Sequence, residues 1–202
     1  MTHSFVAQEE SMESVRTFSN RLSVFLVGTL ISALLYSALF FFNDWITETL
    51  KYDLGVSWIY LPAGLRLFLI LIFGLAGAIG IAAASFAISY FGVFIPDLVT
   101  CIGIGLISGF APLFAKWVVV SNTYISNDLS NLSMQKILLC IVIYALMSSA
   151  FHQYWFMLRD LESGSINHFF VMFAGDVAGS ILLIALIKYG IDLMRRRLPK
   201  GP

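Results

Sequence analysis

Long apolar runs separated by short polar segments dominate the hydrophobic pattern of this chain. The first 21 residues are polar and mixed in charge, and an apolar run begins at residue 22. A membrane-spanning helix needs about 20 apolar residues, so each run of that length predicts a transmembrane helix. The predicted spans are 22–42, 98–120, 134–158 and 168–190, with a longer apolar stretch at 61–94.

The stretch 61–94 allows two interpretations. Thirty helical residues extend about 45 Å, which exceeds the hydrocarbon core of about 30 Å. It is either a single long, tilted helix or two segments broken near Gly74–Gly80, where three glycines occur. We favour two segments, 62–73 and 76–94. This gives six helical segments, or five if the stretch is one helix.

The segment 43–60 is amphipathic and rich in aromatic residues. Tryptophan and tyrosine favour the headgroup layer of a bilayer. We therefore expect this segment to lie along a membrane interface, between the first span and the long apolar stretch.

Composition supports a membrane protein. Apolar residues make up 59% of the 202 residues and charged residues only 12%, whereas soluble domains carry about 25% charged residues. The fold class is therefore an all-α, polytopic transmembrane helical bundle. It comprises a short cytoplasmic segment (1–21), the bundle (22–190) and a basic cytoplasmic tail (191–202). The formal net charge of zero argues against nucleic acid as a partner.

Positive residues predict the orientation. Arg195, Arg196, Arg197 and Lys200 lie beyond the last span, and cytoplasmic segments are enriched in such residues. We expect both termini in the cytoplasm, which requires an even number of crossings and favours six segments. The chain is then a multi-pass protein of the bacterial inner membrane, with lipid around it.

Three polar residues in the spans are candidates for a ligand site or an intramembrane polar cluster: Arg66, His152 and Asp176. A carboxylate at that depth is unfavourable by about 2.5–3.5 kcal/mol, so it marks a functional site by default. Counted at about 1.5 Å per residue, all three fall at similar depth in the outer half. We expect an Arg66–Asp176 ion pair with His152 beside it. Alternatively, Arg66 extends to the headgroups, His152 is a core residue and Asp176 bonds a backbone or hydroxyl group.

Trp155 follows His152 at helical spacing and shares its face. It belongs either to the mouth of the same ligand site or to an interfacial aromatic belt. Small residues at a spacing of four predict close helix packing at Gly105, Gly109, Gly175 and Gly179.

Motifs of common enzymes are absent from the sequence. It contains no HExxH, GxSxG, GxxxxGK[ST] or CxxC pattern. We therefore expect no enzymatic activity, no cofactor and no metal site.

Two stretches resemble the bacterial MASE1 family of integral membrane sensor domains. The first is a Pro-Ala-Gly start with a Phe-Gly helix end and a Gly-Ile run, and the second is a Gly-Asp-x-x-Gly helix. The matching residues are Pro62, Ala63, Gly64, Phe73, Gly74, Gly80 and Ile81, and then Gly175, Asp176 and Gly179. The family usually has around eight helices, and Arg66 stands where an apolar residue is expected. The resemblance implies a related membrane fold that senses or binds something.

Together these features favour a non-enzymatic sensory or interaction module that binds a small molecule or a partner protein within the bilayer. Such a module needs a membrane or signalling partner to transmit a signal. The alternative is a small transport component, such as the substrate-binding subunit of an uptake system, because broken helices often build binding sites at mid-membrane depth.

Overall fold

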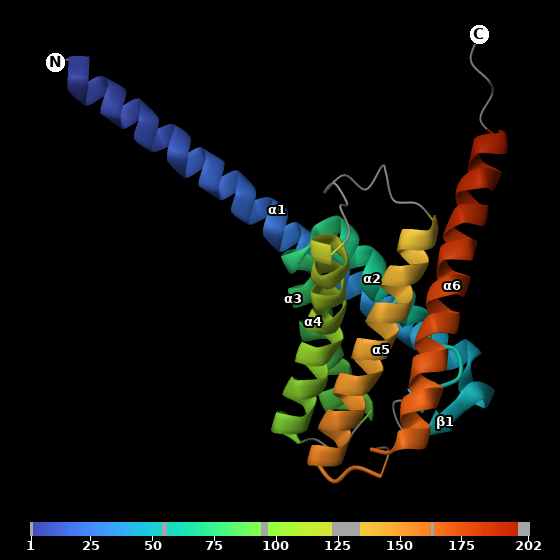
Figure 1. Ribbon diagram of the computed structural model, residues 1–202. Helices are drawn as coiled ribbons and strands as arrows, with labels where there is room; N and C mark the ends of the chain where they lie inside the picture. Colours follow the sequence, from blue (N-terminus) through green and yellow to red (C-terminus); the bar gives the residue numbers. More distant parts are fainter. Residues whose placement is uncertain (1, 54–55, 94–96, 123–133, 163, 198–202) are drawn as a thin grey trace.

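The computed structural model describes residues 2–53, 56–93, 97–122, 134–162 and 164–197 (Figure 1). The α-helices in this part of the chain are α1 (Thr2–Ile46), α2 (Leu61–Phe73), α3 (Leu75–Ile88), α4 (Leu98–Asn122), α5 (Met134–Leu158) and α6 (Ile166–Arg197). The remaining elements are short: η1 (Glu48–Leu50), β1 (Lys51–Asp53), β2 (Val56–Ser57) and the π-helical η2 (Ser89–Val93). The predicted all-α bundle is confirmed.

Within the described ranges, five helical segments are long and apolar enough to cross a membrane. These are Thr17–Ile46, Leu75–Gly92, Leu98–Val119, Met134–Leu158 and Ile166–Met194. The exception is α2, whose 13 residues extend only about 20 Å. The described residues thus form six helical segments, as favoured from the sequence, but α2 is too short to span the hydrocarbon core by itself.

The break between α2 and α3 lies at a single glycine. Gly74 has φ 55° and ψ −124°, a backbone conformation that residues with a Cβ rarely adopt. Its amide donates to Ile70 O at 3.0 Å, and the amide of Ala78 donates to Gly74 O at 3.1 Å. The polypeptide therefore reverses direction within one residue, and the predicted split of the long apolar stretch is confirmed.

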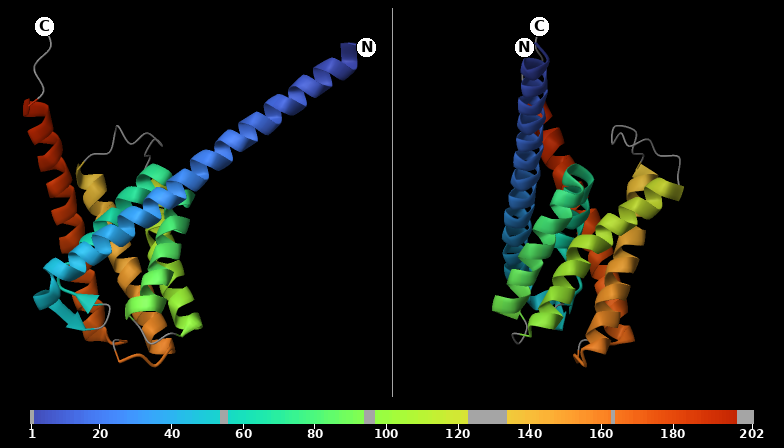
Figure 2. Two further views of the ribbon diagram at one scale, coloured as in Figure 1. Left: turned by 180° about the vertical axis from the view of Figure 1, so that it is seen from behind. Right: turned by 90° about the vertical axis from the view of Figure 1, so that its left-hand side faces the viewer.

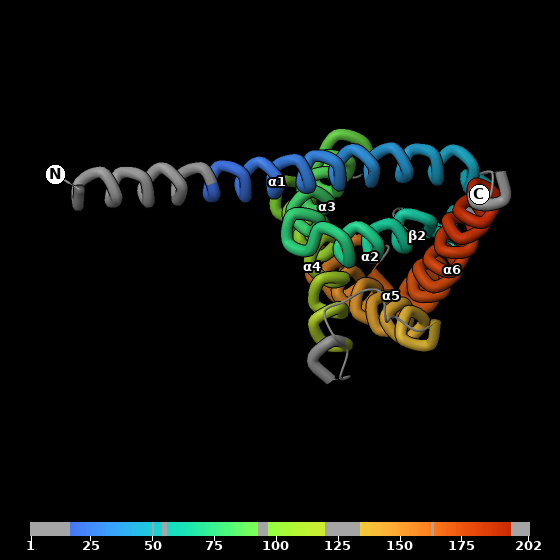
Figure 3. Tube along the Cα trace, turned by 90° about the horizontal axis from the view of Figure 1, so that it is seen from above, coloured from blue at the N-terminus to red at the C-terminus, as the bar shows by residue number. Residues whose placement is uncertain are grey.

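The short helix α2 occupies the centre of the bundle, surrounded by the other helices (Figure 3). One apolar core joins Leu69 and Ile70 of α2 to Tyr36 of α1 and to α3. A second core joins Ala63 and Leu67 of α2 to α4 and α5. Because α2 packs on both cores, Arg66 and most other side chains of this helix are buried within the protein, whereas Phe68 and Ile72 are 38% and 51% exposed.

Two of the predicted packing glycines bring helices α3 and α4 into close contact. A Cβ at Gly109 would lie 2.3 Å from Ala78 O, and one at Gly105 would lie 2.7 Å from Ala82 O. Gly175 and Gly179 also allow close approach, but to the extended chain before α2. There the limiting atoms are Ser57 O and Tyr60 O, each 2.1 Å from the added Cβ. An added Cβ at Gly179 would also lie 2.8 Å from the amide nitrogen of Leu61, so Gly179 lets α6 approach the first residue of α2.

The segment 43–60 contains a small antiparallel hairpin, β1–β2, which the amphipathic pattern did not predict. Two tryptophans of this segment are exposed, Trp45 at 74% and Trp58 at 48%. The hairpin lies toward one end of the bundle, whereas the N-terminal end of α1 and the C-terminal end of α6 lie toward the other (Figures 1 and 2). The two ends of the described chain therefore lie on the same side.

Candidate ligand-binding cavity

The bundle encloses a cavity of about 410 Å³ between its helices and the hairpin, a size in the range of small-molecule sites. Every α-helix of the described chain contributes to its wall. The polar and charged lining residues are Tyr36, Asn43, Asp44, Lys51, Tyr52, Asp53, Ser57, Tyr60, Arg66, Ser85, Ser89, Ser108, Ser148, His152 and Asp176. The remaining lining residues are Phe40, Ile88, Gly92, Ile104, Phe156 and Met172.

Arg66 extends from α2 into a pair of tyrosines. Its Nη2 donates to the hydroxyl oxygens of Tyr36 and Tyr60 at 2.8 and 2.9 Å, and the two hydroxyls are 3.0 Å apart. The guanidinium carbon lies 5.2 and 5.1 Å from the two ring centroids, within the range of cation–π interactions. Arg66 is only 5% exposed, so these contacts offset part of the loss of hydration.

The chain that carries Tyr60 is fixed by two further hydrogen bonds. The amide of Tyr60 donates to Gly175 O at 3.1 Å, and the amide of Leu61 donates to Oδ1 of Asn43 at 2.9 Å. Buried backbone donors need such partners. Gly175, Asn43 and Tyr60 therefore set the position at which α2 begins, and with it the position of Arg66.

His152 is part of a hydrogen-bond chain across three helices. Ser85 of α3 donates to Ser108 of α4 at 2.9 Å, and the Ser108 hydroxyl lies 3.3 Å from Nε2 of His152. Nδ1 lies 2.8 Å from Ser148 O. A carbonyl oxygen only accepts, so the proton is on Nδ1 and Ser108 donates to Nε2. Both ring nitrogens of the neutral imidazole are then satisfied.

Asp176 lies on α6 and is 2% exposed. Its carboxylate is hydrogen-bonded to the side chain of Ser148, the residue whose carbonyl accepts from His152. The second oxygen, Oδ2, is buried and has no hydrogen-bond partner, and the same holds for Nε of Arg66. The structure thus places Arg66, His152 and Asp176 around one cavity.

The direct Arg66–Asp176 ion pair expected from the sequence is not formed. Among the described residues, ion pairs join Lys51 to Asp44 and Arg159 to Asp97, and His168 contacts Asp53, each at 2.7 Å. Arg66 instead uses the tyrosine hydroxyls, which α1 and the chain before α2 bring to it. The two charged side chains interact electrostatically but form no ion pair.

Trp155 does not line the cavity. Its Nε1 donates to Thr100 O at 3.1 Å, and its indole occupies the space that the missing side chain of Gly103 leaves on α4. It joins a polar cluster at the start of α4, in which Arg159 donates to Asp97 and, at 2.9 Å, to the hydroxyl of Thr100. This cluster ties α5 to α4.

The Thr100 side chain and the Arg159 guanidinium hold the pKa of the Asp97 carboxyl at about 2, below its usual value. The hydroxyl of Thr100 donates to Asp97, and its amide donates to the same Oδ2 at 3.0 Å. Asp97 thereby satisfies a free amide at the N-terminus of α4, as helix-capping residues do.

Most residues that line the cavity were not predicted from the sequence, among them Tyr36 and Tyr60, and neither was His168, which contacts the lining residue Asp53. His168 binds Asp53 through Nε2 and contacts the ring of Tyr52 at 5.1 Å, while Ser165 contacts its Nδ1. This ties the hairpin to α6, and Lys51–Asp44 ties it to α1. Tyr36 offered a usable signal, since it places a hydroxyl within an apolar span.

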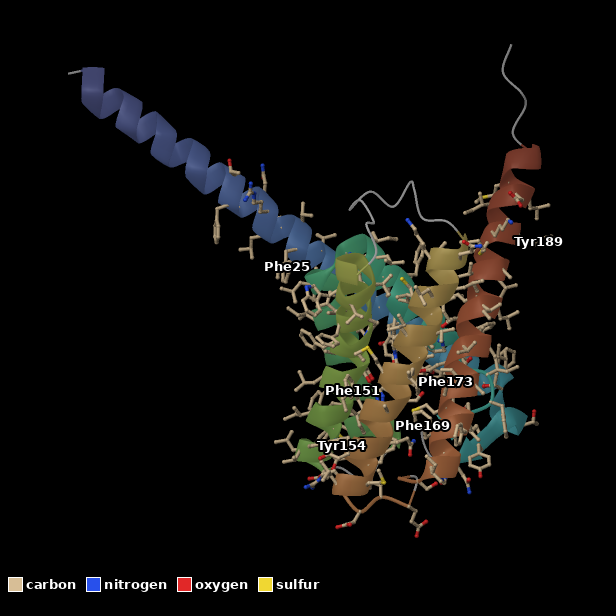
Figure 4. All side chains as sticks on the ribbon, viewed as in Figure 1. Phe25, Phe151, Tyr154, Phe169, Phe173 and Tyr189 are labelled. Carbon is tan, nitrogen blue, oxygen red and sulfur yellow. The ribbon has the colours of Figure 1, made fainter. Side chains whose placement is uncertain are left out.

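The outer surface of the bundle carries large apolar and aromatic side chains (Figure 4). Tyr154, 61% exposed, lies toward the hairpin end of the bundle, and Tyr189, 69% exposed, lies toward the other end. Tyrosines at both ends of a helical bundle match the two interfaces of a bilayer.

In the part of the chain that the structure describes, no group of three or more His, Cys, Asp or Glu could hold a metal ion.

Comparison with known proteins finds no matching family model, no matching curated protein and no matching solved structure.

Proposed function

We propose that this chain is a non-enzymatic ligand-binding module of the bacterial inner membrane that senses a small molecule and passes the signal to a partner protein. One observation carries the proposal: a cavity of about 410 Å³ into which six helices and a hairpin direct polar side chains. Burying Arg66 and Asp176 without a direct pair is unfavourable, so a bound molecule is the simplest reason for keeping both. The sequence resemblance to MASE1 sensor domains agrees with this role.

The orientation follows from the same proposal. Arg195, Arg196 and Arg197 at the C-terminal end of α6 favour a cytoplasmic location for both termini. The hairpin and the mouth of the cavity would then face outward. Single cysteines at Lys51 and Asp192, in a variant that lacks Cys101 and Cys140, test this. An impermeant maleimide should label the first in intact spheroplasts and the second only after lysis; the reverse pattern would overturn the orientation.

Ligand binding is tested by native mass spectrometry of the full chain purified in mild detergent. Wild-type protein should carry a bound small molecule. Ile104→Phe enlarges a side chain that is 5% exposed and lines the cavity, so it should abolish the adduct. Leu106→Phe makes a similar change on the outer face of α4, where Leu106 is 51% exposed, and should leave it intact. An adduct that survives Ile104→Phe, or no adduct in wild type, would refute binding in this cavity.

One observation favours the alternative of a transport component: the break at Gly74, since discontinuous helices often form transport sites. The two functions differ in the partner. A sensory module should co-purify with a kinase, cyclase or similar signalling protein, and this association should change when the ligand is added. A transport subunit should co-purify with an energising protein and move its substrate in vesicles.

A further inference from the structure

The charged residues of the cavity divide into a mouth and an interior. At the mouth, Lys51 is paired with Asp44, and Asp53 contacts His168. In the interior, Arg66 and Asp176 carry opposite charges and form no ion pair with each other, as the salt bridges of the described residues show. The groups at the mouth therefore already have partners, whereas the two interior charges do not compensate each other directly.

The two interior charges also retain free hydrogen-bonding capacity. Nε of Arg66 and Oδ2 of Asp176 are buried without a hydrogen-bond partner, and a buried polar atom left unpaired is unfavourable for the folded protein. A ligand with only a negative group would leave Asp176 uncompensated, and one with only a positive group would leave Arg66 uncompensated. Only a molecule with both groups satisfies both sides of the cavity.

The other polar groups add no net charge to the interior. Both ring nitrogens of His152 are already engaged by Ser148 and Ser108. The rest of the wall includes apolar side chains from α1, α4 and α5, namely Phe40, Ile104 and Phe156. The cavity thus offers a cation and an anion, with apolar surface beside them.

We propose that the cavity binds a small zwitterion, with its anionic group at Arg66 and its ammonium group at Asp176. This inference rests on the proposed function and names the chemical class of the ligand. Each charge of the ligand would then lie next to an opposite charge of the protein and form a hydrogen bond with it. Buried ion pairs are favourable under this condition. A free α-amino acid and the headgroup of phosphatidylethanolamine share this chemistry.

The first arm of the test uses free ligands. Thermal unfolding of the detergent-purified full chain is measured with each of the twenty common α-amino acids. The best of them is then compared with its decarboxylated amine and its deaminated acid. For L-phenylalanine these would be phenethylamine and 3-phenylpropanoate. The amino acid should raise the unfolding temperature, and each analogue should bind at least about tenfold more weakly, since each loses one charge-assisted contact.

The second arm identifies a lipid source. Phosphatidylethanolamine and phosphatidylglycerol are added separately to the delipidated protein. If phosphatidylethanolamine stabilises the protein and amino acids do not, the ligand is still a zwitterion, and it is the lipid headgroup. If neither arm yields a zwitterion that binds, or if a singly charged analogue binds as tightly, the inference is overturned. In the latter case the proposed function survives, because the cavity still binds a ligand.

Asp176→Asn gives a change in selectivity that a purely structural role would not produce. It should weaken binding of the amino acid and strengthen binding of its deaminated acid, because the negative charge that repels an anion is gone. Asp192→Asn, the same substitution on an exposed part of α6, should change neither. Unchanged selectivity in Asp176→Asn would overturn the assignment. The analogue series on the wild-type protein needs no variant and decides the question if Asp176→Asn fails to fold.

Discussion

Arg66 and Asp176 line the same cavity from α2 and α6, yet Arg66 donates to Tyr36 and Tyr60 and forms no ion pair with Asp176. A buried charge is normally kept next to its counter-charge. The tyrosine pair binds the guanidinium instead, and both charged side chains line the cavity without pairing. This separation is what makes the cavity a candidate binding site.

Exchanging the charges of Arg66 and Asp176 should not restore the yield of folded protein that either single substitution lowers. Arg66→Asp and Asp176→Arg will each lower the yield of folded protein, because each places the wrong charge beside fixed partners. The double variant will not recover, since Tyr36, Tyr60 and Ser148 are arranged for the original residues. Fluorescence-detected size-exclusion chromatography measures the folded fraction. Recovery to near the wild-type level would mean that the two side chains form a direct pair.

Tyr36→Phe removes one acceptor from the buried guanidinium. We expect a loss of about 1–3 kcal/mol in the free energy of unfolding, the usual effect of leaving a buried polar group with fewer partners. Thermal or denaturant unfolding in detergent measures it. Tyr154→Phe is the matched control, because the Tyr154 side chain is 61% exposed. An equal effect of the two substitutions would show that the Tyr36 hydroxyl does not stabilise Arg66.

Gly109→Ala should destabilise the α3–α4 contact. The added methyl would lie 2.3 Å from Ala78 O, a backbone atom that moves only if the helices separate. Overpacking of this kind is unfavourable by about 1–3 kcal/mol. Gly190→Ala places a methyl in open space on α6, and should be neutral or stabilising by up to about 1 kcal/mol. Unfolding midpoints of the two variants compare them directly, and a neutral Gly109→Ala would contradict the packing.

The Asp97–Arg159 contact should depend on pH in a defined direction. The folded-state pKa of Asp97 is about 2, below the unfolded value of about 3.9. The stabilisation is therefore fully present above about pH 4 and is lost as the pH falls through about 2. The unfolding temperatures of wild type and Asp97→Asn should differ by a constant amount from pH 7 to pH 5 and converge below pH 4. A difference that persists at pH 2 would contradict this pKa.

The helices were predictable because their signal is local. Residues 134–158 were predicted as a span and form α5 with the same bounds, and the break in 61–94 occurs at the first of three glycines. The length of an apolar run and its glycine content can be found from a short stretch of sequence. The bilayer sets the required length of a span and requires its backbone groups to be hydrogen-bonded within the protein. The hairpin is a different case, because β1 and β2 have only three and two residues and no alternating pattern can develop.

The partners of the polar residues were not predictable in the same way. Helix depth placed Arg66, His152 and Asp176 at similar levels, but depth carries no information about rotation. Arg66 is satisfied by Tyr36, 30 positions away in the sequence, and Trp155 rotates toward α4 although it lies one turn from His152. Such contacts depend on how helices pack against each other, which residue spacing in one helix does not encode.

The most direct measurement is a crystal structure of the full chain grown in a lipidic mesophase. We expect electron density for a bound molecule in the cavity, in contact with the guanidinium of Arg66 and the carboxylate of Asp176, with the tyrosine contacts unchanged. A cavity that holds only water, or one that has closed so that Arg66 and Asp176 pair directly, would contradict it.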